Sequence, residues 1–227
     1  MVLFGLTPIL LIGCPGEEQP TQPSPIHTEG FAFFDVGETT QFSDALRERL
    51  KKSLGPEAIE YRNIINLEVN SKGFLENYFP ELHQLNLRLN TPLGERIEHN
   101  TIKLMYRYAR NNDLPFDYIE LVFSKHTGKP LYIHIYSRKD ITDVFRTIGD
   151  KFGEPSKIDL PQATGQSIYW IDKKNVLLVT MTPTRQGNQL NRLMIYFSEN
   201  IAELVSIEEK ERREKEEGRR RAGERAF

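Results

Sequence analysis

The sequence predicts an α+β fold, in which antiparallel strands from two three-strand meanders form the sheet or sheets and helices pack on one face. Several segments alternate apolar and polar residues with the period of two typical of half-buried strands. Other segments have the spacing of amphipathic helices and end at Gly and Pro. A chain of 227 residues with 38% hydrophobic residues is also long enough to bury its own core.

The first meander is expected between residues 101 and 137. Its strands are predicted over residues 101–110, 117–124 and 130–137. The loop between the second and third strands contains Gly128, which can adopt a positive φ. We therefore expect these two strands to form a hairpin.

The second meander is expected closer to the C-terminus. Its strands are predicted over residues 167–172, 176–183 and 190–198, with turns at 173–175 and 186–188. Together the two meanders would form either one six-stranded sheet or two stacked three-stranded sheets. A further strand is expected at residues 63–69.

Helical spacing appears before each meander. Helices are predicted over residues 43–54, 73–89 and 139–152. Ser43 is the expected N-cap of the first helix, and Pro80 should break or restart the second. Residues 46–59 and 145–158 each run from an amphipathic helix through a Gly/Pro stop towards a strand, a pattern that a duplicated αβ unit would produce.

The charge balance excludes two classes of protein. The formal net charge is −2, so the chain lacks the basic field that nucleic-acid binding needs, and we expect no nucleic-acid partner. A mean hydropathy of −0.51 excludes a polytopic membrane protein. Residues 207–227 carry eight basic and seven acidic residues, which indicates a solvated, fraying helix. The alternative is that Arg219, Arg220 and Arg221 bind anionic lipid or a polyanion.

The N-terminus indicates export. Residues 2–13 form an uncharged apolar run that is too short to cross a bilayer and is typical of a signal peptide. The run ends at Leu11-Ile12-Gly13-Cys14, which resembles the lipobox of bacterial lipoproteins. The resemblance implies cleavage before Cys14 and acylation of that residue, with diacylglycerol on the thiol and a palmitate-like chain on the new amine. The segment departs from the pattern because no basic residue precedes the apolar run; the alternative is a soluble protein with an incidental thiol.

The resemblance also implies a location. The segment from Pro15 to Pro25 has four prolines and no large apolar residue, so we expect an extended tether. Such a protein would be anchored in the cell envelope by its lipid and would face the periplasm. Pro15 occupies the position where an Asp can signal inner-membrane retention, which favours the outer membrane. The expected organisation is a signal peptide (1–13), a lipidated Cys and tether (14–30), one α+β domain (31–206, with 31–100 and 101–206 as possible subdomains) and a charged tail (207–227).

A second resemblance concerns the folded part. A helix, a Gly/Pro stop and a small meander containing Tyr169-Trp170 are similar to the small domains of envelope lipoproteins of the outer-membrane assembly type. The chain departs from that family in length, and residues 37–41 offer only a partial counterpart of its Gly-Met-Thr helix start. The likeness implies a compartment and says nothing of a role.

No catalytic motif was found in the sequence. The five histidines, at positions 27, 83, 99, 126 and 134, show no metal-ligand spacing, and Cys14 is assigned to the lipid anchor. Neither a nucleophile elbow nor a phosphate-binding glycine loop is present. We therefore expect no catalytic residue, no metal and no cofactor.

Aromatic residues supply the candidate site. Tyr side chains combine contact area with a polar end, which suits interfaces. The predicted interaction face consists of Tyr106, Tyr108, Tyr132, His134, Tyr136 and Tyr169. The alternative is a tyrosine-rich sheet packed beneath helices.

Two functions remain open at this stage. The preferred function is a non-enzymatic binding or assembly module whose partner is an envelope protein or polymer. The alternative is a lipid-anchored hydrolase-like enzyme with a site around His134, Asp117 and Glu120. Two or more of His83, His99, His126 and His134 beside one carboxylate in one cleft would make the enzyme the preferred function.

Overall fold

The computed structural model describes residues 30–69, 72–90, 97–158, 165–184 and 189–226. The signal segment, Cys14 and nearly all of the tether lie outside these residues and stay predictions. The strands are β1 (Ala32–Phe33), β2 (Val36–Gly37), β3 (Glu57–Ile64), β4 (Glu98–Tyr106), β5 (Tyr118–Ser124), β6 (Pro130–Ser137), β7 (Ser156–Ile158), β8 (Gln166–Asp172), β9 (Asn175–Pro183) and β10 (Gln189–Tyr196). The helices are α1 (Asp44–Leu54), α2 (Phe74–Tyr78), α3 (Pro80–Leu89), α4 (Thr142–Phe152) and α5 (Ser198–Ala226), with a 3-10 turn at Ala109–Asn112.

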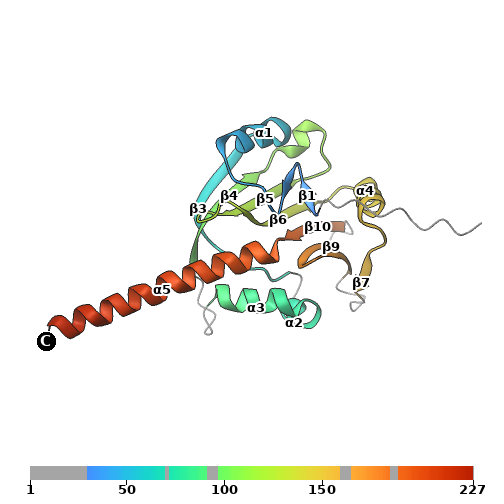
Figure 1. The fold of residues 1–227 in the computed structure, drawn as a ribbon. Coiled ribbons are helices and arrows are strands. Elements are labelled where there is room, and N and C mark those ends of the chain that lie inside the picture. Colours follow the sequence, from blue (N-terminus) through green and yellow to red (C-terminus); the bar gives the residue numbers. More distant parts are fainter. Residues whose placement is uncertain (1–29, 70–71, 91–96, 159–164, 185–188, 227) are drawn as a thin grey trace, which may run out of the picture.

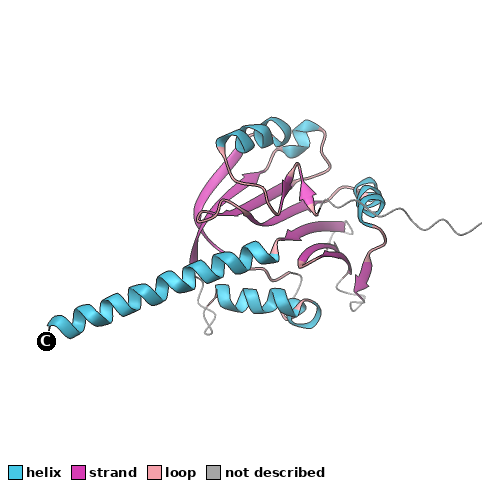
Figure 2. Cartoon of the chain, in the orientation of Figure 1, coloured by secondary structure: helices cyan, strands magenta, loops and turns pink. Residues whose placement is uncertain are grey.

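One eight-stranded antiparallel sheet forms the centre of the fold, in the order β3-β4-β5-β6-β10-β9-β8-β7 (Figures 1 and 2). Strands β1 and β2 form a separate hairpin. The predicted α+β class is confirmed, and the two predicted meanders are parts of one sheet. They meet where β6 pairs with β10, with Ile135 opposite Leu193.

The order of elements repeats within the chain. Helix α1 precedes the meander β3 to β6, and helix α4 precedes the meander β7 to β10. Both helices have 11 residues and end at a glycine with positive φ, Gly55 at 87° and Gly153 at 79°. Glycine adopts this conformation at little cost, which suits it to end a helix. The duplicated αβ unit suggested by the sequence is therefore present as a repeat of topology.

Helices cover both faces of the sheet, whereas the sequence led us to expect one covered face. Helices α1 and α4 pack on one face, where Leu46, Leu50 and Leu54 of α1 join the first core cluster. Helices α2, α3 and α5 pack on the opposite face over a second cluster. The run 176–180 in β9 is buried at every position, as expected for a strand covered on both sides.

The segment after β3 corrects one predicted strand. The expected strand at residues 63–69 is wrong, because β3 ends at Ile64. Ile65, Leu67 and Val69 are buried in alternation, which produces a strand-like pattern. However, the N–H of Leu67 donates to the Oδ1 of Asn86 in α3, at 2.9 Å, instead of to a neighbouring strand. The segment therefore closes the second core without extending the sheet.

The local signals for the helices are confirmed. The Oγ of Ser43 accepts a hydrogen bond from the N–H of Leu46, which caps α1 as predicted. Pro80 is the first residue of α3 and separates it from α2. The hairpin β1–β2 and the edge strands β3 and β7 were not predicted at their observed positions.

Helix α5 extends well beyond the body of the protein (Figure 1). It has 29 residues, and Ile201, Leu204 and Val205 bury its first turns in the second core. Every residue from Lys210 to Arg225 is exposed. No helix of the described residues combines the length and apolar character needed to cross a membrane.

Candidate functional site

Three residues of the predicted interaction face lie together. Tyr132, His134 and Tyr136 alternate along β6 and face the side of the sheet that carries the second core. The ring centroids of Tyr132 and His134 are 4.7 Å apart, and those of His134 and Tyr136 are 6.5 Å apart. These three residues of the predicted face therefore lie together on one side of the sheet.

The other three residues lie elsewhere. Tyr106 is fully buried in the first core, on the opposite side of the sheet. Tyr108 follows the end of β4 and is 53% exposed. Tyr169 lies on β8 and packs edge to face against Phe79, with the ring centroids 5.1 Å apart. The predicted six-residue face is thus wrong as a single surface, because strand alternation places Tyr106 on the far side of the sheet.

Glu120 lies beside His134, and its carboxylate already has hydrogen-bonding partners. The two residues are direct cross-strand partners in β5 and β6. The carboxylate of Glu120 accepts hydrogen bonds from the hydroxyls of Tyr118 (2.9 Å) and Tyr132 (3.2 Å), and the Nζ of Lys103 lies 3.9 Å away. Burial, together with the negative charge of Glu120, raises the pKa of both tyrosines, which therefore stay protonated donors. The carboxylate stabilises this part of the sheet and has few free acceptor sites.

A pocket of about 410 Å³ opens over His134. Strands β6 and β10 and the segment after β3 supply its lining, which consists of Asn66, Glu68, Val69, Lys72, His134, Tyr136, Arg192 and Met194. Two lining nitrogens, the Nε2 of His134 and the Nε of Arg192, are buried and have no hydrogen-bond partner in the described part of the chain. The guanidinium of Arg192 lies over the ring of Tyr136, 5.8 Å from its centroid.

His134 is neutral in this environment. Burial lowers the pKa of its imidazole to about 4, and the charges of Arg192 and Lys103 act in the same direction. Glu120 opposes the change without cancelling it. At neutral pH, one ring nitrogen of His134 is therefore a donor and the other an acceptor.

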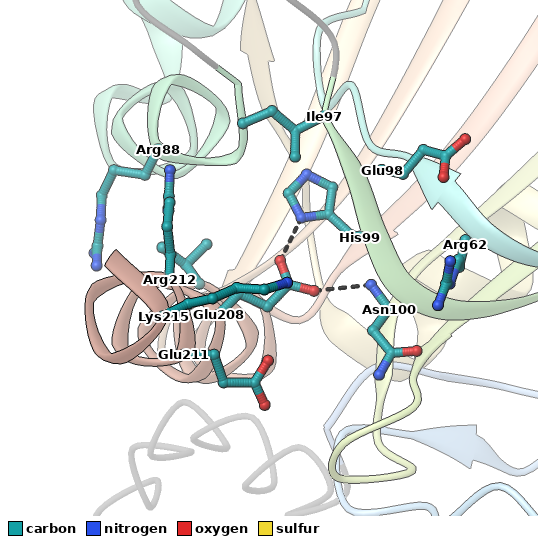
Figure 3. Close-up of a pocket in the computed structure, with 11 residues that line it drawn as sticks. Arg62, Arg88, Ile97, Glu98, His99, Asn100, Glu208, Glu211, Arg212 and Lys215 are labelled. Carbon is teal, nitrogen blue, oxygen red and sulfur yellow. Dashed lines mark hydrogen bonds and ion pairs between the residues drawn. The ribbon is translucent and has the colours of Figure 1, made fainter. Parts of the chain in front are cut away.

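A second hollow, of about 500 Å³, lies between β4 and α5 (Figure 3). His99, which is 4% exposed, occupies its wall. The Nδ1 of His99 is 2.6 Å from the Oε2 of Glu208 in α5, and its Nε2 is 2.8 Å from the carbonyl oxygen of Leu89. The other carboxylate oxygen of Glu208 accepts the backbone N–H of Asn100, at 2.8 Å.

These contacts orient His99 and Glu208. The carbonyl of Leu89 can only accept a hydrogen bond, so the Nε2 of His99 must donate. Burial acts to raise the pKa of Glu208, but hydrogen bonds from His99 and Asn100 and the nearby His126 lower it overall. The lowered pKa keeps the carboxylate of Glu208 ionised at neutral pH, where it accepts from Asn100 and lies within hydrogen-bond distance of the Nδ1 of His99. The contact between His99 and Glu208 attaches α5 to the start of β4.

A second histidine lies near the same carboxylate. The Nε2 of His126 is 3.8 Å from Glu208, and its Nδ1 is 3.6 Å from Glu211. Two histidines therefore flank one carboxylate, but His126 is not among the described residues that line the hollow, so the two histidines do not share one cleft. Among the described residues, no group of three or more His, Cys, Asp or Glu side chains is arranged to hold a metal ion.

The sequence analysis did not identify Arg192 or Glu208 as site residues. The cross-strand pair of Glu120 and His134 follows from the register of the predicted hairpin, so the sequence could predict that contact. The position of Arg192 beside His134 depends on the pairing of β6 with β10, which belong to two separate meanders. Glu208 is 109 positions from His99, and no local pattern links them.

Neither the protein-family models, nor the curated proteins, nor the solved structures contain a significant match to this chain.

Proposed function

We propose that this protein is a lipid-anchored, non-enzymatic binding module of the bacterial cell envelope, and that the pocket over His134 holds a carboxylate of its ligand. One observation carries the binding site: two buried nitrogens without partners, on His134 and Arg192, border the same pocket. Buried polar groups in proteins are almost always hydrogen-bonded. A ligand group that accepts from Arg192 and bonds to His134 would complete both.

The charges around the pocket favour a monoanion. Arg192 and Lys72 contribute two positive charges to the lining, and Glu68 contributes one negative charge. The neutral His134 adds none. A carboxylate balances the remaining charge, and the fork of an Arg side chain matches its geometry. The ring of Tyr136 and the side chain of Met194 offer an apolar surface for the rest of the ligand.

The lipobox-like segment supports the anchored location. Acylation at Cys14 would supply the two or more lipid chains that stable anchoring requires. The segment from Pro15 to Pro25 would span roughly 35 Å at about 3.1 Å per residue, enough to hold the domain clear of the bilayer. The proposed partner is accordingly an envelope protein or polymer, with the outer membrane favoured for the anchor.

Benzoate, a flat carboxylate, is a direct probe of the pocket. Titration of the protein, followed by NMR chemical shifts, is expected to perturb His134, Tyr136 and Arg192. Arg192→Gln should weaken binding by about tenfold, the cost of losing a charged hydrogen-bonding partner. Arg138→Gln removes the same charge from an exposed position and should leave the affinity unchanged. Equal loss in both variants, or no shift in the wild type, would refute the carboxylate pocket.

Metabolic labelling with a fatty acid tests the anchor. The wild type should carry label and partition into detergent, and Cys14→Ala should lose both properties. Label and partitioning that persist in the variant would remove the argument for location, whatever the pocket binds.

A hydrolase-like enzyme is the second candidate, favoured by the two histidines that flank Glu208. Against it, both ring nitrogens of His99 are already engaged. The imidazole of His134 has a pKa of about 4 and is therefore a weak base at neutral pH. A general base works best when its pKa lies near the working pH. Hydrolysis of p-nitrophenyl acetate above the buffer rate, lost in His126→Gln, would establish the enzyme; equal rates would favour the binding module.

A further inference from the structure

The hollow between β4 and α5 collects positive charge from several elements. Four basic residues line it: Arg62 from β3, Arg88 from α3, and Arg212 and Lys215 from α5 (Figure 3). Arg88 is neutralised, because its Nε and Nη2 donate to the two carboxylate oxygens of Glu209 at 3.0 and 2.9 Å. The other three make no hydrogen bond or ion pair with any residue that the structure describes.

Two of the three acidic residues of the hollow already have partners. Glu208 is held by His99 and by the N–H of Asn100. Glu211 lies 3.6 Å from the Nδ1 of His126. Glu98 is the one acidic residue of the described lining without a partner. The hollow therefore offers three basic side chains, those of Arg62, Arg212 and Lys215, whose donors are not used by the described residues.

The backbone places Arg62 at this hollow by an unusual conformation. The register between β3 and β4 shifts between Tyr61 and Asn63, and Arg62 has a positive φ of 59°. A β-bulge of this kind can redirect a side chain, and a non-glycine residue in the left-handed region carries a conformational cost. The two cations of α5 are three residues apart and therefore lie on one side of the helix.

We infer that this hollow binds a phosphoryl group. A phosphate monoester presents three acceptor oxygens and close to two negative charges at neutral pH, which suits three basic side chains with unused donors. Arg forks and a Lys ammonium are the donors that phosphate recognition uses. The site is separate from the pocket over His134 and does not depend on the proposed carboxylate ligand. The phosphoryl group can come from a soluble phosphate ester or from a phospholipid headgroup.

Isothermal titration with inorganic phosphate at constant ionic strength tests the site in the full chain. The double variant Arg62→Gln, Lys215→Gln should bind at least about tenfold more weakly than the wild type. The double variant Lys210→Gln, Arg213→Gln removes the same charge from exposed positions of α5 outside the hollow, and should bind as the wild type does. Equal weakening in both double variants, or no binding to the wild type at 10 mM phosphate (about the limit of a weak site), overturns the inference.

Vesicles identify the source of the phosphoryl group. The full chain carrying Cys14→Ala, which removes the proposed lipid attachment, is sedimented with phosphatidylcholine vesicles with and without phosphatidic acid. Sedimentation that needs phosphatidic acid, is competed by phosphate and is lost in Arg62→Gln, Lys215→Gln assigns a lipid headgroup. Phosphate binding without sedimentation assigns a soluble ester. Sedimentation that the Arg62 and Lys215 substitutions leave unchanged contradicts a headgroup site in the hollow.

Discussion

His99 and His134 lie in the same sheet, on β4 and β6, and both are shielded from solvent, yet their ring nitrogens are used in opposite ways. Both ring nitrogens of His99 lie within hydrogen-bond distance of a partner, the carboxylate of Glu208 and the carbonyl oxygen of Leu89. The Nε2 of His134 has no partner among the described residues, and burial lowers the pKa of its imidazole to about 4, although the charge of Glu120 acts to raise it. The comparison teaches that burial alone does not decide how a histidine is used, and that the histidine with an unused nitrogen is the one available to a ligand.

The largest effect is expected for His99→Ala. The substitution leaves Glu208 and the carbonyl of Leu89 without the imidazole that contacts both. A hydrogen bond to a charged group contributes about 1.5–3 kcal/mol and one to a neutral group about 1 kcal/mol, so we expect a loss of about 3 kcal/mol. Urea denaturation measures the free energy of unfolding. Arg213→Gln, in the exposed part of α5, is the control, with an expected change below about 0.5 kcal/mol. A loss under about 1 kcal/mol for His99→Ala would show that the pair does little to hold α5.

The second effect is a pH dependence assigned to His134. Its pKa is about 4 in the folded protein and about 6.5 in the unfolded chain, so the unfolded chain binds the proton more readily between these values. The contribution of neutral His134 to the free energy of unfolding is therefore fully present above pH 6.5 and is lost as the pH falls through about 4. We expect a loss of about 3 kcal/mol, measured by urea denaturation at several pH values. His134→Gln cannot titrate and should show a flatter profile; an unchanged profile would contradict the neutral state.

The third effect concerns Glu208, the partner of His99. Its pKa is lowered in the folded protein, so its contribution is present above its ordinary pKa and is lost as the pH falls through the lowered value. Glu208→Gln should cost about 1–2 kcal/mol at pH 7. The difference between variant and wild type should shrink as the pH falls through the lowered pKa of Glu208, because the glutamate then becomes uncharged like the glutamine that replaces it. A difference that is constant with pH would mean that shape, rather than charge, holds the helix.

The smallest effect is expected for the adjacent ion pair on the same helix. Arg88 and Glu209 form a two-bonded pair, but their side chains are 45% and 30% exposed. Exposed pairs contribute about 0.2–1 kcal/mol, so Arg88→Gln should cost roughly 0.5 kcal/mol and less at high salt. A cost equal to that of Glu208→Gln would contradict the importance of burial in this comparison.

Local signals predicted much of the secondary structure. The Ser43 cap, the break at Pro80 and the alternation in both meanders each depend on neighbouring residues, and the structure confirms them. The pattern of Ile65, Leu67 and Val69 misled, because alternate burial arises in any extended segment laid over a core. Backbone hydrogen bonds, which separate the two cases, leave no trace in the sequence.

The candidate sites were less accessible. The part of the pocket formed by His134 and Glu120 follows from one hairpin. Arg192 reaches it through the junction of two repeats, and Glu208 reaches His99 through a helix at the other end of the chain. Both contacts depend on how elements pack in three dimensions, and residue spacing does not encode that packing.

Helix α5 packs against the sheet only at its start and is exposed along the rest of its length, which has a mechanical consequence. At about 1.5 Å per residue, the stretch from Lys210 to Ala226 forms a lever roughly 24 Å long. The seated part of the helix includes three apolar side chains in the second core, the contact of Glu208 with His99 and the pair of Glu209 with Arg88. A force applied at the C-terminal end of α5 therefore acts with a long lever arm on the short part of the helix that packs against the sheet.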